Sequence, residues 1–116
     1  MKYRVEIIKI GEMVEELLGE KILILFNADA PEDLAEISVL HTGYDLVEDV
    51  KPGDKVKIGD MEYTVTGVGS EANKTLRELG HCTLKFNGLS KTELPGDISL
   101  KGQIPNIKNG DIISIY

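Results

Sequence analysis

Apolar and polar residues alternate at the start of the chain, where Tyr3, Val5 and Ile7 are separated by charged residues. This period of two is the pattern of a half-buried β-strand, and it continues to residue 10. Residues 81–87 alternate in the same way and predict a second strand. Short apolar segments bounded by turn residues predict six further strands, at residues 21–26, 37–42, 55–58, 62–68, 98–101 and 111–116.

Three short stretches have helical patterns instead. In residues 13–18 the apolar side chains recur at helical spacing, and a glycine follows them. Residues 31–36 begin with a proline, which suits the first position of a helix. The third helix follows a glycine-rich turn, and Ser70 is expected to cap its N-terminus. Gly80 is placed to end this helix as a left-handed residue.

About eight short strands joined by closely spaced turns are typical of a small β-barrel. We therefore expect a mainly β protein, in which a small, partly open β-barrel of short strands carries two or three short helices. A length of 116 residues suits one hydrophobic core, so a single domain over residues 1–116 is expected. The exposed edges of a partly open barrel leave a homodimer as an open alternative.

Charge and cysteine content restrict the classes of partner. A formal charge of −7 argues against a nucleic-acid partner and against an anionic membrane surface, and it suits a partner with a basic patch. The longest apolar run, residues 22–26, is far too short to span a bilayer, so no direct membrane insertion is expected. The N-terminus lacks the apolar block of a signal peptide. The single cysteine cannot form an internal disulfide, which favours a cytoplasmic protein.

Motifs for metal, cofactor and hydrolytic chemistry are missing from the sequence. It contains no CxxC and no HExxH, and its two histidines are far apart, so neither a metal nor a cofactor is predicted. No serine stands in a G-x-S-x-G elbow. The Gly-Val-Gly-Ser run at residues 67–70 precedes a helix, where backbone amides could hold an anion. It lacks the lysine of a P-loop, and a structural turn explains it more simply.

His41 and His81 remain as candidates for chemistry, although a histidine in a β-strand is more often packed or hydrogen-bonded than catalytic. His81 stands where the third helix meets the next strand, and a bond to a nearby carbonyl would explain it. His41 ends an apolar strand and is followed by Thr42 and Gly43, where the chain becomes polar. We therefore expect the His41 ring to be anchored by the strand and open to a partner at the surface.

Two long segments resemble a known family. The run SEANKTLRELGHCTLKFNGLSKTELPG is similar to the C-terminal half of the glucitol/sorbitol-specific enzyme IIA family, and ILILFNADAPEDLAEISVLHTG to its N-terminal half. That family belongs to the bacterial phosphoenolpyruvate-dependent sugar phosphotransferase system. In the family the phosphorylated histidine ends the strand that follows an A-P-x-D-L segment, which corresponds to His41 here. Relatives can carry a further Cys-His at the next positions, where this chain has Thr42 and Gly43.

The resemblance implies a phosphoryl relay. His41 would accept phosphate from the histidine-containing phosphocarrier protein and pass it to a cysteine of the IIB component, which works with the membrane component IIC. His81 would be its neighbour or a structural residue. The candidates for stabilising the phosphoryl oxygens are the backbone amides of Gly69 and Ser70 and the hydroxyls of Ser38, Thr42 and Ser70. His81 and Arg77 are further candidates.

Two interpretations remain beside the relay. The first is a non-catalytic small β-barrel binding module, in which both histidines are structural. The second is a sugar-responsive regulatory relative that keeps the fold and has lost the relay. Apolar residues around His41 are expected either to form a docking patch or to belong to the core; these residues are Val39, Leu40, Tyr44 and Leu46.

Overall fold

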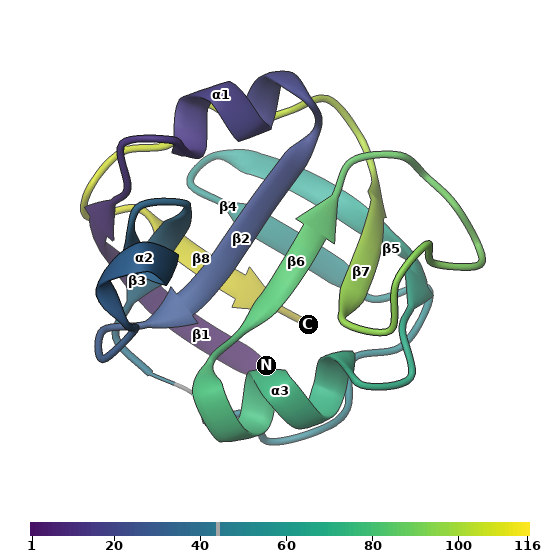
Figure 1. Cartoon of the computed structure of the whole chain (residues 1–116). Helices are drawn as coiled ribbons and strands as arrows, with labels where there is room; N and C mark the ends of the chain where they lie inside the picture. The colour runs from purple at the N-terminus through teal and green to yellow at the C-terminus, as the bar shows by residue number, and fades with distance from the viewer. Residues whose placement is uncertain (44) are drawn as a thin grey trace.

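A computed structural model describes residues 1–43 and 45–116, and it confirms a mainly β barrel (Figure 1). The described residues form eight strands and three short helices. The strands are β1 (Tyr3–Ile10), β2 (Ile22–Asn27), β3 (Ser38–His41), β4 (Lys55–Ile58), β5 (Met61–Val68), β6 (Cys82–Lys85), β7 (Asp97–Lys101) and β8 (Ile112–Ile115). The helices are α1 (Val14–Gly19), α2 (Glu32–Ala35) and α3 (Ala72–Leu79).

The barrel is closed, whereas the sequence predicted a partly open one. The strands follow the order β1-β3-β2-β6-β7-β5-β4-β8, and β8 pairs with β1 to complete the ring. The β2–β3 and β6–β7 pairs are parallel, and the other pairs are antiparallel. Closure pairs the first and last strands of the chain, so that no strand of the ring keeps a free edge.

The core lies inside the ring, where alternate residues of each strand meet. In β1 the side chains of Tyr3, Val5 and Ile7 are buried and the residues between them are exposed, as the alternation predicted. In β6 the buried and partly exposed positions alternate in the same way. None of the helices in the described part of the chain is long and apolar enough to cross a membrane.

Helix α3 covers one end of the barrel, and its buried residues Ala72 and Leu76 face the core (Figure 1). It ends at Gly80 with φ +61°, the left-handed conformation that the sequence predicted. The predicted cap at its start is wrong, because Glu71 occupies the N-cap and no side chain bonds there. The Glu71 amide donates instead to the Pro95 carbonyl at 2.9 Å, so a neighbouring loop satisfies the start of the helix.

Strand β3 sets the position of His41. It lies between β1 and β2, and His41 is opposite Ile7 on one side and Asn27 on the other. The side-chain amide of Asn27 donates to the carbonyl of Leu79, the last residue of α3. The C-terminal end of α3 is therefore fixed next to the end of β3.

Candidate functional site

His41 is completely buried, with an exposed side-chain fraction of 0%. The expectation that its ring would reach the surface is wrong. The strand does end there, as the sequence predicted, but Gly80 from α3 and Gly43 from the following residues lie against the ring. The covering group on the α3 side comes from a residue 39 positions away in the chain.

The hydrogen bonds around the His41 ring determine which nitrogen carries the proton. Nε2 lies 2.7 Å from the carbonyl oxygen of Gly80, which can only accept. Tyr3 donates its hydroxyl proton to the carbonyl of Gly43 at 2.8 Å. Its oxygen, 3.4 Å from Nε2, is therefore an acceptor as well. Two acceptors face Nε2, so Nε2 carries the proton and donates it chiefly to the nearer one.

The other ring nitrogen, Nδ1, keeps its lone pair. The backbone amide of Gly43 donates to it over a long 3.3 Å bond, which is consistent with an unprotonated nitrogen. Burial lowers the pKa of His41 below its ordinary value of 6.5, and the Gly80 carbonyl opposes this only in part. The ring is therefore neutral near pH 7 and holds one nucleophilic nitrogen.

Gly80 is required at this contact for two reasons. Its positive φ favours glycine, and a Cβ atom built on it would lie 2.6 Å from Cε1 of His41 and 2.9 Å from the Gly43 oxygen. Only a residue without a side chain allows the α3 terminus to approach the ring this closely. The sequence predicted Gly80 as a helix terminus, and the structure adds its contact with His41.

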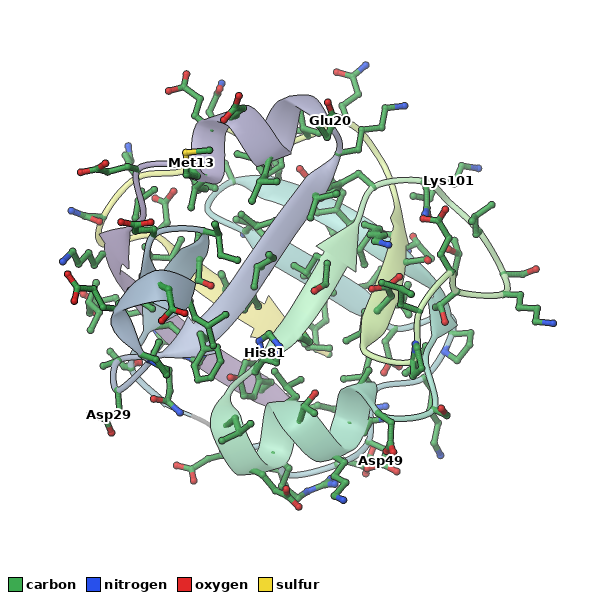
Figure 2. The ribbon with its side chains drawn as sticks, in the orientation of Figure 1. Met13, Glu20, Asp29, Asp49, His81 and Lys101 are labelled. Atoms are coloured by element: carbon green, nitrogen blue, oxygen red, sulfur yellow. The ribbon has the colours of Figure 1, made fainter. Side chains whose placement is uncertain are left out.

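His81 follows Gly80 directly and has a different environment. Its ring is half-buried at the junction between α3 and β6, where Figure 2 labels it. Nδ1 donates to the carbonyl of Leu25 at 3.0 Å, and the ring packs on Phe26 with centroids 4.7 Å apart. Within the described residues, Nε2 of His81 makes no hydrogen bond. This geometry fits the predicted bond to a nearby carbonyl, and it also leaves one nitrogen available.

The structure does not bring the other candidate residues to the His41 ring. Thr42 accepts the Glu6 amide through Oγ1 at 3.0 Å. The amide of Gly69 donates to the Asp97 carbonyl at 2.8 Å. Both Gly69 and Ser70 precede α3, whereas Gly80 follows it, and eight helical residues separate them by about 12 Å. Ser38, at the other end of β3, is buried, and its Oγ has no partner among the described residues.

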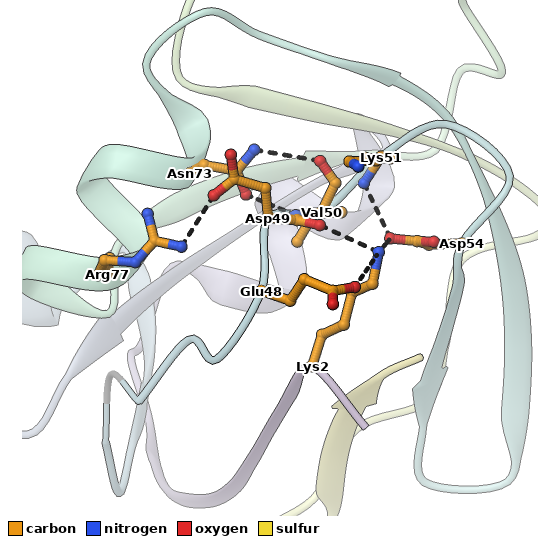
Figure 3. Close-up of polar contacts among 8 residues, drawn as sticks. All are labelled: Lys2, Glu48, Asp49, Val50, Lys51, Asp54, Asn73 and Arg77. Carbon is orange, nitrogen blue, oxygen red and sulfur yellow. Dashed lines mark hydrogen bonds and ion pairs between the residues drawn. The ribbon is translucent and has the colours of Figure 1, made fainter.

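Arg77 pairs with an acidic residue on the surface. Its guanidinium donates to Asp49 at 2.8 Å, and both side chains are about half exposed (Figure 3). Such an exposed and screened pair is typical of a solvated helix residue. Of the apolar residues around His41, Val39, Leu40 and Leu46 are buried and belong to the core. Tyr44 lies outside the described residues.

The segment of residues 49–54 is fixed to α3 and to Lys2, which directly precedes β1 (Figure 3). Lys2 donates to the Asp49 carbonyl at 3.0 Å and pairs with Asp54 at 2.8 Å. Asn73 of α3 exchanges two hydrogen bonds with the backbone of Val50, at 2.7 and 3.1 Å. Residues 49–54 are thus held on the same end of the barrel as α3.

Tyr3 is the residue of this site that sequence reasoning missed. Its place in the alternation identified it as a core residue, and nothing in the sequence relates its hydroxyl to His41. A buried tyrosine hydroxyl usually finds a hydrogen-bond partner, and this tendency was the one signal in the sequence for a role of Tyr3 beyond packing.

The fold and the site define a class: a closed β-barrel with a neutral histidine enclosed at one end. Over residues 2–114 the chain matches the family model described as "PTS system glucitol/sorbitol-specific IIA component". It is 39% identical over 104 residues to the "PTS system glucitol/sorbitol-specific EIIA component" of Shigella flexneri, covering 90% of this chain and 85% of the relative. The same figures hold for the protein of that name from Escherichia coli strain K12.

A solved structure supports the same family. The crystal structure of a PTS system IIA component from Enterococcus faecalis V583 superimposes with a TM-score of 0.87 at 30% identity, covering 97% of this chain and 98% of that one. The chain therefore belongs to the glucitol/sorbitol-specific IIA component family of the sugar phosphotransferase system, as the resemblance implied. Membership implies a part in phosphoryl relay together with other proteins of that system.

Proposed function

We propose that His41 is the phosphoryl acceptor of this IIA component. It takes the group from the histidine-containing phosphocarrier protein and passes it to a cysteine of the IIB component, for glucitol/sorbitol uptake through IIC. Family membership supports the relay, and the single observation that supports His41 is its fixed tautomer. A neutral ring with Nε2–H held by Gly80 leaves Nδ1 as the nucleophile.

The proposed transfer has two steps, each of which forms one bond to phosphorus and breaks another. The Nδ1 lone pair attacks phosphorus, the N–P bond of the donor phosphohistidine breaks, and the donor imidazole leaves with the bonding pair. The His41 ring then carries positive charge, and the Gly80 carbonyl becomes the acceptor of a charge-assisted hydrogen bond from Nε2–H. In the second step a IIB thiolate attacks phosphorus, and the bonding pair returns to Nδ1. The protein positions the group and stabilises charge in both steps.

Access to Nδ1 is the main requirement of this proposal. The Gly43 amide lies on Nδ1, and the ring has no exposed surface. Phosphorus can approach only after Gly43 moves away from the ring. The conformation described here is therefore the resting state of the proposed relay.

The same burial supports two competing proposals. In a non-catalytic binding or regulatory β-barrel, His41 can stay enclosed, because no phosphoryl group has to reach its ring and Gly43 need not move. Alternatively, the half-buried His81, with Nδ1 bonded and Nε2 available, would accept the group without any movement of Gly43.

Labelling of three proteins separates these proposals. The wild-type chain, His41→Gln and His81→Gln are incubated with phosphoenolpyruvate, enzyme I and the phosphocarrier, and acid-labile, base-stable phosphate is measured. We expect label on the wild type and on His81→Gln, and none on His41→Gln. Label that persists on His41→Gln and disappears from His81→Gln would assign the relay to His81. A wild-type chain that takes no label would favour the non-catalytic barrel.

The partners follow from the same proposal. A surface with formal charge −7 favours phosphocarrier and IIB surfaces with basic patches. The relay would operate in the cytoplasm, where a chain with one unpaired cysteine is stable in its reduced state. A homodimer remains a proposal, which measurements of molecular mass in solution would test. The closed ring has no free strand edges, so the feature that first suggested a dimer is gone.

A further inference from the structure

The hydroxyl of Tyr3 holds the residue that covers the nucleophilic nitrogen. It donates to the Gly43 carbonyl at 2.8 Å, and the Gly43 amide in turn donates to Nδ1 of His41. In the described part of the chain, these are the only hydrogen bonds of the Gly43 backbone. Among the described residues, Gly43 is therefore held by two side chains and by no main-chain partner.

The two bonds differ in strength. The bond from the Gly43 amide to Nδ1 is long, at 3.3 Å, whereas the bond from Tyr3 has an ordinary length. Tyr3 is itself fixed, because its ring is 1% exposed within β1 and meets the His41 ring edge-on at an interplanar angle of 85°. The stronger of the two contacts on Gly43 thus comes from a rigid core residue.

We propose that Tyr3 is a positioning residue: its hydroxyl keeps Gly43 against Nδ1 of His41 and thereby sets how often that nitrogen is exposed. Loss of the hydroxyl leaves Gly43 with only the long bond to Nδ1. Gly43 then moves away more often, and His41 becomes more reactive. The Gly80 bond at 2.7 Å keeps the tautomer unchanged, so the variant alters access and leaves the nucleophile as it was.

The test is the acylation of His41 by diethyl pyrocarbonate. An unprotonated imidazole nitrogen attacks a carbonyl carbon of the reagent and ethyl carbonate leaves, so no protein partner is needed. It is carried out at about pH 7.5, above the ordinary histidine pKa of about 6.5, and each site is followed by mass spectrometry. One hydrogen bond is worth about 0.5–1.5 kcal/mol, so Tyr3→Phe should raise the His41 rate by about 2- to 10-fold. The rate at the half-buried His81 in the same chain should not change.

Two controls separate access from general destabilisation. Tyr63→Phe also removes a buried hydroxyl, but that hydroxyl has no partner among the described residues, so the His41 rate should stay at the wild-type value. Alkylation of Cys82 by iodoacetamide reports opening of the whole barrel, because this thiol is buried and burial raises its pKa to about 12. Gly88→Ala strains the backbone at a residue with φ +66° and destabilises the whole barrel by an amount similar to that of Tyr3→Phe, so it should raise the Cys82 rate and leave the His41 rate unchanged.

An unchanged His41 rate in Tyr3→Phe would overturn the proposal. So would a His41 rate that rises as much in Gly88→Ala as in Tyr3→Phe, because a merely structural role of Tyr3 predicts that general destabilisation exposes His41 equally in both variants. The importance of Tyr3 for phosphoryl transfer rests on the proposed function. If His41 is the acceptor, Tyr3→Phe should accept phosphate faster, by a factor similar to the increase in the acylation rate. A chain that takes no phosphate, with Tyr3→Phe still accelerating acylation, would refute the relay and leave the role of Tyr3 in place.

Discussion

Replacement of Gly80 by alanine tests the contact between α3 and His41. The substitution adds one methyl group at a residue with φ +61°, where a side chain is strained. The added carbon also lies 2.6 Å from Cε1 of His41 and 2.9 Å from the Gly43 oxygen, closer than Cβ atoms approach other atoms in real structures. One change therefore combines backbone strain with a steric clash at the site.

The expected loss of stability is the sum of two contributions. A left-handed residue with a Cβ costs roughly 1–2 kcal/mol. Inserting a carbon into a packed interior costs about 1–3 kcal/mol more, because the ring of His41 must move. Gly80→Ala should therefore lower the free energy of unfolding by about 2–5 kcal/mol, which a domain with about 5–15 kcal/mol of stability can survive.

Gly88 provides a matched control for the strain alone. It has a nearly identical φ of +66°, but among the described residues beyond its two chain neighbours no atom lies within 4 Å of a Cβ built on it. Gly88→Ala should lose only the strain contribution of roughly 1–2 kcal/mol. Urea unfolding followed by circular dichroism gives both values, and their difference isolates the contact at His41.

Equal losses in the two variants would refute the proposed close packing of Gly80 on His41. The imidazole NMR signals provide a second comparison. Gly80→Ala should shift the signals of His41, and Gly88→Ala should leave them at their wild-type positions.

Three further predictions concern charge. Lys85→Met should lower the free energy of unfolding, measured in urea, by about 3–5 kcal/mol, because it removes the cation that lies 2.9 Å from the buried carboxylate of Asp97. Arg77→Ala should lower it by less than about 1 kcal/mol, because the Arg77–Asp49 pair is exposed and screened. Burial lowers the pKa of His41, so the unfolded chain binds that proton first as the pH falls below about 6.5. Wild-type stability should therefore fall more steeply below that pH than the stability of His41→Gln; equal slopes would contradict the lowered pKa.

Local patterns predicted the elements that depend on neighbouring residues. The alternation of Tyr3, Val5 and Ile7 marked the buried face of β1, because side-chain direction in a strand follows from the backbone alone. Gly80 was predicted to be left-handed for a similar reason, since the end of a helix is a local event.

The environment of His41 could not be predicted in this way. The ring lies between Tyr3 from β1 and Gly80 from α3, residues 38 and 39 positions away. Closure of the barrel likewise depends on the pairing of β1 with β8, from opposite ends of the chain. The sequence indicated correctly that the chain becomes polar after His41, but polarity of the next residues does not determine what packs on the ring.

The most direct measurement of the relay is a nitrogen-15 NMR spectrum of the histidine-labelled protein before and after phosphorylation by the phosphocarrier. We predict that phosphorus becomes bonded to Nδ1 of His41, while Nε2 keeps its proton and donates it to the Gly80 carbonyl. Phosphorus bonded to Nε2 of His41, or to His81, would contradict it.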